Sequence, residues 1–240
     1  MISLINGLDI SSFRFADEFL MTKIKANLLS YGDNPKFLNL WCQICDSDIT
    51  ALICKMEQNV IIVSNYLADF DEIKDFLKVI GFETLSAEPY ILHKLGLKFT
   101  EYQVVLKIAE KGGDLPPMPN IKGVFETLYS EENPHIKRVN FEGFYVDLNH
   151  RIRHNTASAV LVDSAVCIAS HITDESAVIS GVVTLKSARK SGLGSAVLRS
   201  LINGMDGRKI FAATKETTVP FYIKNGFKTH SKTAIFNVED

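Results

Sequence analysis

The sequence predicts an α/β protein of two domains, and three observations lead to this prediction. The chain has 240 residues, which is more than one typical domain requires. Hydrophobic residues make up 46% of the chain, so each half holds enough apolar side chains for a core of its own. Strand-like apolar runs also alternate along the chain with segments whose apolar residues recur at helical spacing. The fold class is therefore α/β, in the mixed sense that includes α+β.

A segment rich in glycine and proline divides the chain. Residues 110–120 contain two glycines and three prolines, which can continue neither a helix nor a central strand. We expect an N-terminal α/β domain at 1–110, a linker at 111–120 and a second domain at 121–240.

The first half reads as a mixture of helices and strands. A helix at 69–79 is the clearest, because Phe70, Ile73, Phe76 and Leu77 share a face and Gly81 ends it. The expected elements are helices at 15–29 and 69–79 and strands at 37–45, 50–55, 60–64, 82–86 and 97–108.

The second half has the same character. We expect helices at 121–129, 141–151, 194–203 and 217–225, and strands at 158–162, 165–171, 177–186, 209–213 and 232–237. Both halves therefore contain three strands followed by a helix and a further strand.

The charge and hydropathy exclude several classes of function. The net charge of −2 gives no bulk attraction to nucleic acid or to an anionic membrane. The N-terminus has no basic region followed by an apolar run, and no apolar stretch approaches the roughly 20 residues of a membrane helix. We expect a cytoplasmic protein.

The cysteines and histidines do not suggest a metal site. Cys42 and Cys45 form a CxxC, but no second pair accompanies it, and it lies in an apolar, strand-like run. We interpret both as strand cysteines. His93, His135 and His230 each stand alone in the sequence, without the spacing of metal ligands.

The most informative segment is the turn after the strand expected at 177–186. It contains Arg189, Lys190, Gly192 and Gly194, and a helix follows at once. The first N–H groups of a helix are unpaired and carry partial positive charge. Glycines let the backbone approach an anion closely, and the two cations add formal charge. The turn therefore predicts a phosphate or pyrophosphate site, although a purely conformational role is the alternative that the turn alone leaves open.

Two other phosphate-binding patterns do not fit this turn. A P-loop ends in Gly-Lys-Ser/Thr, whereas this chain reads Leu193-Gly194-Ser195. A dinucleotide fingerprint needs a third glycine three residues after the second, where Val197 stands.

Two motifs together resemble a known family. Arg189-Lys190-Ser191-Gly192-Leu193-Gly194 resembles the R/Q-x-x-G-x-G/A signature of the GNAT superfamily of N-acyltransferases. Residues 219–227, Val-Pro-Phe-Tyr-Ile-Lys-Asn-Gly-Phe, are similar to the family's late aromatic-Tyr-x-x-x-Gly-Phe motif. The resemblance covers about Ile121 to Phe236. It implies a mixed, mostly antiparallel central sheet flanked by helices, preceded here by the smaller N-terminal domain.

The resemblance implies an N-acetyltransferase that moves an acetyl group from acetyl-CoA to a primary amine by direct attack in a ternary complex. The pyrophosphate would lie on the 189–194 turn and the pantetheine arm would pair with the strand at 182–184. A strand N–H, from Val183 or a neighbour, would hold the oxyanion. Tyr222 would protonate the leaving thiolate, with packing on the sheet as its alternative role. The implied cofactor-binding residues are Val182, Val183, Thr184, Arg189, Lys190, Ser191, Gly192, Leu193 and Gly194.

The chain departs from the family pattern at two places. The family often has Asn about seven residues before the tyrosine, where this chain has Lys215. The common Pro-Glu-Tyr before the arginine is replaced by Lys186-Ser187-Ala188. Both departures limit what carries over about the adenine and pantetheine contacts.

An attacking amine must first lose a proton, since an alkylammonium has a pKa near 10.4. His171, Asp174 and Glu175 are the candidate bases, with a solvated turn as the alternative for the last two. The basic stretch 149–154 is a candidate site for an acidic substrate or the CoA phosphates, or else a solvated helix end.

The expected partners are acetyl-CoA as co-substrate and an unidentified amine. We expect no metal, nucleic acid or membrane as a partner. A homodimer is compatible with these expectations. A non-catalytic acyl-CoA-binding or regulatory domain is the alternative function. Residues 1–108 carry no recognisable chemistry. Their element order fits a degenerate relative of the same fold without the phosphate turn, which would cover the acceptor side or form an interface.

Overall fold

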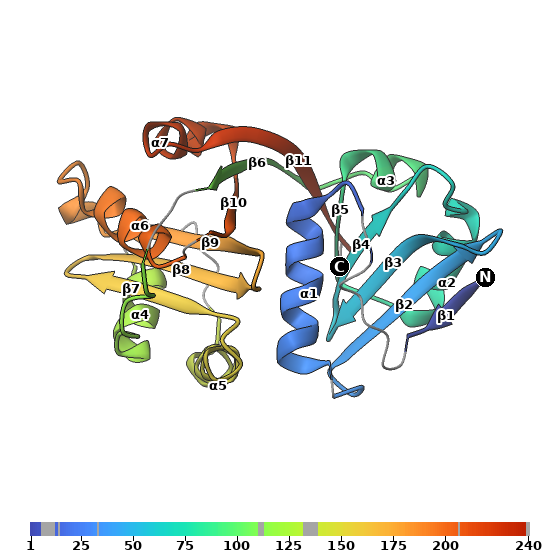
Figure 1. The fold of residues 1–240 in the computed structure, drawn as a ribbon, viewed down its shortest axis with the longest axis horizontal. Coiled ribbons are helices and arrows are strands. Elements are labelled where there is room, and N and C mark those ends of the chain that lie inside the picture. Colours follow the sequence, from blue (N-terminus) through green and yellow to red (C-terminus); the bar gives the residue numbers. More distant parts are fainter. Residues whose placement is uncertain are drawn as a thin grey trace. The chain divides into compact units, whose positions relative to one another are not determined.

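The computed structural model describes residues 1–5, 13, 15–32, 34–109, 113–131, 139–205 and 207–238. These residues group into two compact units (Figure 1). Unit 1 comprises Met1–Val105, Thr214–Thr217 and His230–Asp240, and unit 2 comprises Leu106–Ala213 and Thr218–Thr229.

Unit 1 is built on a sheet with the strand order β1-β2-β3-β4-β5-β11. Strands β2, β3 and β4 form an antiparallel meander, β5 runs parallel to β4, and β11 runs antiparallel to β5. Its elements are β1 (Ile2–Leu4), α1 (Glu18–Tyr31), β2 (Leu38–Cys45), β3 (Asp48–Met56), β4 (Asn59–Ser64), α2 (Phe70–Ile80), β5 (Thr84–Ala87) and α3 (Pro89–Lys94), followed by β6 (Glu101–Ala109).

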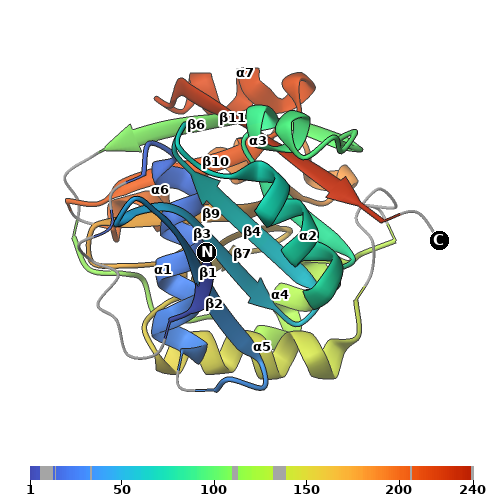
Figure 2. The same cartoon turned by 90° about the vertical axis from the view of Figure 1, so that its right-hand side faces the viewer.

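Helices cover both faces of the unit 1 sheet. Figure 2 shows α1 and α2 on opposite sides of strands β2 to β4. Helix α2 is amphipathic, and its Ile73 and Leu77 are buried against Ile53 and Ile62 of the sheet. Trp41 of β2 packs edge-on against Phe76 of α2, with ring centroids 5.3 Å apart. The apolar spacing that predicts this helix is therefore also what attaches it to the sheet.

Unit 2 contains the segment with the two motifs. Its strands follow the order β10-β9-β8-β7, in which β7, β8 and β9 are antiparallel and β10 is parallel to β9. Its elements are α4 (Ile121–Leu128), α5 (Phe141–Arg153), β7 (Ser158–Val162), β8 (Ala165–Ile172), β9 (Ser176–Thr184), α6 (Leu193–Asn203), β10 (Lys209–Thr214) and α7 (Val219–Lys224), followed by β11 (Lys228–Asn237).

The two faces of the unit 2 sheet are covered by different helices, with α6 on one side and α4 on the other (Figure 1). Val124 and Leu128 of α4 and Leu148 of α5 form a core with Val166 and Val183 of the sheet. The predicted mixed, mostly antiparallel sheet flanked by helices is confirmed.

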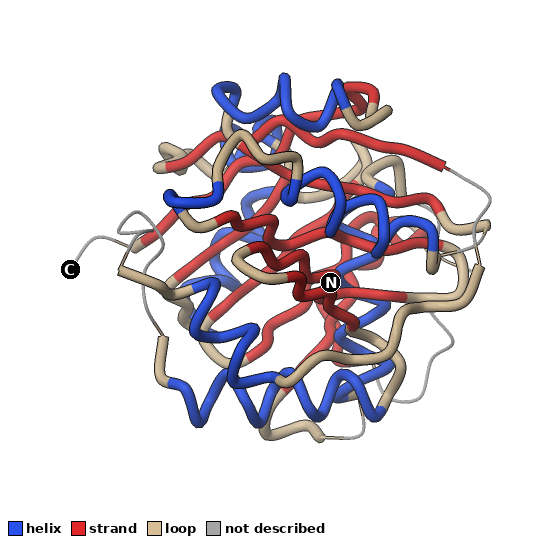
Figure 3. Tube along the Cα trace, turned by 90° about the vertical axis from the view of Figure 1, so that its left-hand side faces the viewer, coloured by secondary structure: helices blue, strands red, loops and turns tan. Residues whose placement is uncertain are grey.

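Most expected elements are present with small shifts in their ends, and Figure 3 traces them along the chain. The strand expected to reach residue 186 ends at Thr184, because Lys186–Ala188 turn into a short 3-10 helix. The helix expected at 217–225 is a 3-10 turn, Glu216–Thr218, followed by α7. Strand β1 and helix α3 were not predicted, and α3 begins at Pro89, a residue that suits the first turn of a helix.

The units do not divide the chain into two consecutive halves. Strand β11 lies near the end of the chain, yet its residues 230–237 belong to unit 1, where Ala234 pairs with Ala87 of β5. The last residues of β6 belong instead to unit 2. The expected boundaries at 110 and 121 therefore differ from the observed grouping, because long-range strand pairing leaves no local sequence signal.

The expected linker falls partly outside the described residues, at 110–112. Residues 113–120 have no regular secondary structure and belong to unit 2. Gly113 donates its N–H to the carbonyl of Asn203 at the end of α6. Cys42, Cys45, Cys54 and Cys167 are all free thiols, and the first two lie on β2 as predicted. In the described part of the chain, no helix combines the length and apolar character that crossing a membrane requires.

Candidate active site

Strand β9 opens away from its neighbour at the point where the two motifs meet. It pairs with β10 only from Ser176 to Ile179, although β9 continues to Thr184. The register between β8 and β9 shifts at Ser180, which is a β-bulge. The edge of β9 from Gly181 to Thr184 is therefore not paired with β10, and its backbone groups can pair with another extended chain.

The register shows which N–H groups face this open edge. Leu185 donates its N–H to the carbonyl of Ser164, and Val183 pairs with Val166 two residues along. In an antiparallel ladder every second residue pair exchanges both hydrogen bonds, so Val183 directs its N–H and C=O toward β8. Val182 and Thr184 direct theirs to the open edge. The N–H of Val183 is thus turned toward β8, whereas that of its neighbour Val182 faces the open edge.

The turn at 185–194 has the backbone geometry of an anion cradle. Lys190 and Gly192 both have left-handed φ values, of 67° and 90°, and α6 begins immediately afterwards. The N-cap residue Gly192 has no side chain to cap α6, and the only side-chain bond made by its first N–H groups among the described residues is a long one, from Leu193 to Ser191 Oγ at 3.5 Å. A Cβ on Gly192 would meet nothing within 4 Å, so the space beside it is open. Exposed N–H groups at an uncapped helix start can bind an anion.

Internal hydrogen bonds hold this turn against the end of β9. Arg189 Nε donates to the Thr184 carbonyl at 3.3 Å, and Ser191 Oγ donates to the Ala188 carbonyl at 2.6 Å. The turn also carries three cationic side chains, Lys186, Arg189 and Lys190, all of them at least partly exposed. The local potential is therefore positive although the whole chain is slightly acidic.

Tyr222 is connected to β9 through its neighbour Cys167. It is 6% exposed, and Cys167 of β8 is close enough to act on its titration. Cys167 in turn pairs with Val182. Phe221 and Phe227 pack edge-on against the Tyr222 ring, at 5.2 and 5.3 Å between centroids.

The Tyr222 hydroxyl has the protonation state that a proton donor needs. Burial raises the pKa of Tyr222 above its ordinary value, and the neighbouring Cys167 acts in the same direction. The phenol is therefore protonated at neutral pH. Its hydroxyl makes no hydrogen bond to any residue that the structure describes, so it is available to a bound molecule.

The candidate bases lie toward the other end of β9. Asp174 and Glu175 are exposed in the turn that precedes Ser176, and a strand rises about 3.3 Å per residue, so Ser176 and Val182 are roughly 20 Å apart. His171 pairs with Val178 and its Nδ1 lies 2.6 Å from Ser170 Oγ. The structure does not bring these three side chains to the open edge.

The basic stretch 149–154 forms the end of α5. Arg151 is buried, pairs with Asp147 at 2.9 Å and reaches the Ser170 carbonyl. His150 and His154 stack with ring centroids 4.3 Å apart. Because Arg151 serves the packing of α5, the net positive charge available to a ligand here is smaller than the sequence suggests.

Three features of the site were not predicted. The bulge at Ser180, the Cys167 thiol opposite Val182 and the contact between residues 184 and 194 all depend on strand register or on packing between elements. No pattern within one segment signals them. Among the described residues, no three His, Cys, Asp or Glu side chains are placed to hold a metal ion together.

Comparisons with known proteins concern the family and the fold. The model of the acetyltransferase (GNAT) domain matches residues 129–238. A GCN5-related N-acetyltransferase from Sphaerobacter thermophilus has a similar fold, with a TM-score of 0.57 at 12% identity over 92% of this chain and 91% of that one. Another from Kribbella flavida gives 0.56 at 11% identity over 94% and 97%.

A tandem GNAT protein from the clavulanic acid biosynthesis pathway also resembles the whole chain. Its TM-score is 0.55 at 10% identity, covering 100% of this chain and 98% of that one. At such identities the likeness concerns the fold alone. No curated protein matches the chain.

Proposed function

We propose, from the match of residues 129–238 to the model of the acetyltransferase (GNAT) domain, that the chain transfers an acetyl group from acetyl-CoA to a primary amine. The transfer proceeds by direct attack in a ternary complex. The observation that carries the proposal is the open edge of β9, which leads directly into the cationic, glycine-containing start of α6.

Acetyl-CoA is proposed to bind along this continuous surface. Its pyrophosphate accepts hydrogen bonds from the N–H groups at the start of α6, beside Arg189 and Lys190. Gly194 has no side-chain cap, and the long 3.5 Å bond from the Leu193 N–H to Ser191 Oγ would be exchanged for the phosphate. Its pantetheine arm runs along the edge of β9 as an added strand and pairs with the backbone of Val182 and Thr184. The side chain of Val183 packs in the core beneath the strand, and its backbone does not pair with the pantetheine arm. Ser191 and Gly192 shape the turn.

The acetyl group then lies where β9 separates from β10. The neutral amine attacks the thioester carbon, and the carbonyl oxygen becomes an oxyanion that the Val182 N–H can stabilise. Collapse of this intermediate breaks the C–S bond and releases the CoA thiolate. Tyr222 donates its proton to the sulfur, which its buried, protonated phenol is suited to do. The attached nitrogen loses its extra proton to solvent water, which gives the neutral amide, and the Tyr222 phenolate takes a proton back from solvent.

The deprotonation of the amine is assigned to water, because none of the three candidate bases His171, Asp174 and Glu175 lies at the open edge of β9 in the described structure. Proton loss then depends on the amine's own pKa, which is near 10.4 for a simple alkylamine. Dimerisation and a cytoplasmic location stay predictions.

Binding of acetyl-CoA can be tested through the glycine at the start of α6. Gly192→Val places a branched side chain at a φ of 90°, which strains the turn and fills the open space above the N–H groups. We expect acetyl-CoA affinity, measured by calorimetry, to fall at least tenfold. Gly207→Val is the matched control, since Gly207 also has a positive φ of 70° with nothing within 4 Å but lies at another turn.

Catalysis is tested separately by thiol release from acetyl-CoA across a panel of amines. Amine-dependent release establishes the transferase. Tight binding without any release would favour the non-catalytic acyl-CoA-binding alternative. Unchanged affinity in Gly192→Val would show that the pyrophosphate does not lie at this turn.

A further inference from the structure

The two units repeat one arrangement of strands and helices. Unit 1 contains β2-β3-β4-α2-β5 and unit 2 contains β7-β8-β9-α6-β10. In both, the first three strands form an antiparallel meander and the fourth runs parallel to the third. A helix and a strand then follow in each case: α3 and β6 come after β5, and α7 and β11 come after β10. The start of α2 therefore corresponds to the start of α6, where the pyrophosphate is proposed to bind.

The start of α2 is already occupied by a carboxylate of the chain itself. Asp69 is the N-cap of this helix, and its Oδ1 accepts hydrogen bonds from the N–H groups of Asp71 at 3.1 Å and Glu72 at 3.0 Å. These are N–H groups of the kind that an incoming phosphate would require.

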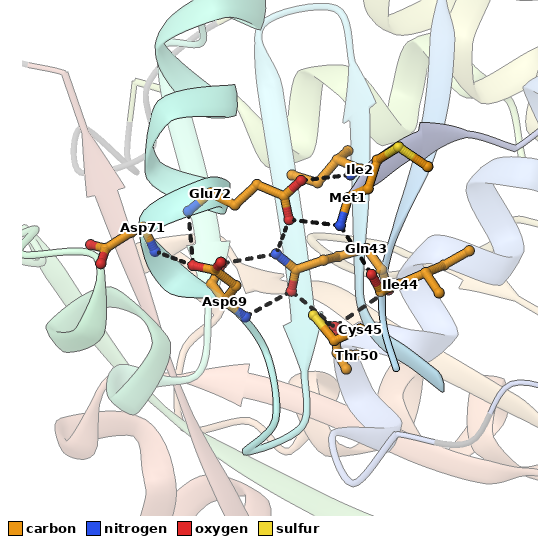
Figure 4. A network of polar contacts seen from close by, with 9 residues as sticks. All are labelled: Met1, Ile2, Gln43, Ile44, Cys45, Thr50, Asp69, Asp71 and Glu72. Atoms are coloured by element: carbon orange, nitrogen blue, oxygen red, sulfur yellow. Dashed lines mark hydrogen bonds and ion pairs between the residues drawn. The ribbon is translucent and has the colours of Figure 1, made fainter. Parts of the chain in front are cut away.

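A polar network fixes Asp69 and Glu72 in this position, as Figure 4 shows. The fully buried Gln43 of β2 accepts from the Asp69 N–H at 2.9 Å and donates to the Asp69 carbonyl at 2.8 Å. Its Nε2 also donates to Glu72 Oε2 at 2.7 Å. Thr50 Oγ1 donates to the Gln43 oxygen at 2.9 Å. Each polar atom of the buried Gln43 side chain thus has a partner, which makes the arrangement costly to rearrange.

Charge and backbone conformation separate the two helix starts as well. The turn before α6 carries Lys186, Arg189 and Lys190, and its N-cap is the left-handed Gly192, which has no side chain to cap the helix as Asp69 does. Residues 64–72 before and within the start of α2 contain no glycine and no cation. They carry Asp69, Asp71 and Glu72 instead. A diphosphate brought to α2 would meet three carboxylates, of which only Glu72 is paired with a cation in the described part of the chain, the Met1 ammonium at 3.2 Å. It would also find the N–H groups of residues 71 and 72 already bonded to Asp69.

We propose that unit 1 is a second copy of the GNAT-like fold in which the Asp69 carboxylate takes the place of the CoA pyrophosphate. The chain then binds one acetyl-CoA, at unit 2, and Asp69, Gln43 and Glu72 are the residues that exclude a second molecule. This inference rests on the proposed function of unit 2 and adds to it the stoichiometry and its cause.

Calorimetry and amide hydrogen exchange with CoA test the stoichiometry on the full chain. We expect one CoA to bind per chain. Amide exchange should slow within residues 189–196 and stay unchanged within residues 65–73. A second equivalent, or protection at 65–73, would overturn the inference. A chain that bound no CoA at all would contradict the proposed function of unit 2. The capping role of Asp69 would then be tested with variants whose measurements need no ligand.

Asp69→Ala removes the acceptor, whereas Asp69→Asn keeps an oxygen that can cap the helix. We expect Tm to fall by about 2–6 °C in Asp69→Ala, with faster amide exchange at Asp71 and Glu72, and to change little in Asp69→Asn. An Asp69→Ala chain with wild-type Tm and wild-type exchange at those two amides would show that the carboxylate does not occupy the helix start, and would overturn the proposal.

Discussion

Thr184 and Gly194 touch so closely that a Cβ on residue 194 would stand 2.9 Å from Thr184 Oγ1. This contact joins the last residue of β9 to the first turn of α6. It therefore sets the distance between the open strand edge and the uncapped helix start, which are the two surfaces proposed to hold acetyl-CoA. The glycine at 194 is required by packing, whereas Gly192 is required by its left-handed φ of 90°.

The first prediction concerns this contact. Gly194→Ala should push α6 away from β9, cost about 1–3 kcal/mol of stability as overpacking does, and weaken acetyl-CoA binding. Adding Thr184→Ala removes the atom that clashes and should restore part of both losses. Thr184→Val, which keeps an atom at that position, should restore neither. Chemical denaturation and calorimetry measure the two effects, and full stability and affinity in Gly194→Ala would show that the contact does not shape the site.

The second prediction is that Tyr222 is the general acid. Tyr222→Phe removes only the hydroxyl, which bonds to none of the described residues, so the edge-on packing with Phe221 and Phe227 should survive. We expect kcat to fall by about 10²-fold or more, in the range of general acid catalysis. KM for acetyl-CoA should change little, because the hydrogen bond strengthens only as charge develops on sulfur.

Tyr145→Phe is the matched control for this measurement, since Tyr145 is 47% exposed on α5 and lies in neither motif. It should keep the wild-type rate. A Tyr222→Phe enzyme with wild-type kcat would assign the tyrosine to packing alone.

The third prediction follows from the distance between the acidic turn and the strand edge. The double variant Asp174→Asn, Glu175→Gln should keep kcat/KM within about twofold of wild type, because the two carboxylates precede the start of β9. The pH profile of kcat/KM should rise toward the pKa of the free amine and show no inflection from an enzyme carboxylate. A loss of kcat/KM of tenfold or more in the double variant would show that one of the two carboxylates takes part in the mechanism.

Local sequence patterns were sufficient for most of the elements and for the placing of the glycines and cations of residues 185–194 between a strand and a helix. The cradle depends on residues 185–194 alone, where strand, glycines, cations and helix follow one another, so its chemistry is visible in one short segment. The direction of the Val183 N–H could not be predicted, because it depends on which residue pairs of β8 and β9 exchange hydrogen bonds. The role of Asp69 was also hidden. An acidic N-cap is common in helices, and the proposal that it replaces a pyrophosphate rests on the correspondence of α2 with α6, which no single segment reveals.

The pairing of β11 with β5 could not be predicted for a related reason. These residues are separated by most of the chain, and alternating apolar residues signal a strand without indicating its partner. The expected division into consecutive domains assumed that each half completes its own sheet. The grouping of residues 230–240 with unit 1 shows that the halves are joined by more than the linker.

The fourth prediction uses this pairing. Residues 113–120 lack regular structure and include exposed glycine and proline, so limited proteolysis should cut there first. The two fragments should nevertheless elute together under native conditions, because Ala234–Asn237 of one pair with Thr84–Ala87 of the other. Gel electrophoresis and size-exclusion chromatography check both points. First cleavage within 175–230, or separation of the fragments without denaturant, would contradict the prediction.

The fifth prediction concerns Asp17, the buried N-cap of α1. Its Oδ1 accepts from the Leu20 N–H at 2.8 Å, whereas Oδ2 is buried without a hydrogen-bond partner among the described residues. Burial, with a smaller contribution from Glu88, raises the pKa of Asp17 from 3.8 to about 6. The folded state thus prefers the protonated acid. Asp17 costs no stability below about pH 4, and the cost grows as the pH rises through 6, up to roughly 3 kcal/mol.

Asp17→Asn keeps an oxygen for the Leu20 N–H and removes the charge. We expect the variant to unfold at a higher temperature than wild type at pH 7.5, and the difference to disappear as the pH is lowered to 4. Asp75→Asn is the control, because Asp75 is exposed and its pKa is lowered by Lys78, so it should show no gain at pH 7.5. A Tm difference between Asp17→Asn and wild type that did not vary between pH 4 and 7.5 would show that the Asp17 carboxylate is not held at a raised pKa in the folded chain.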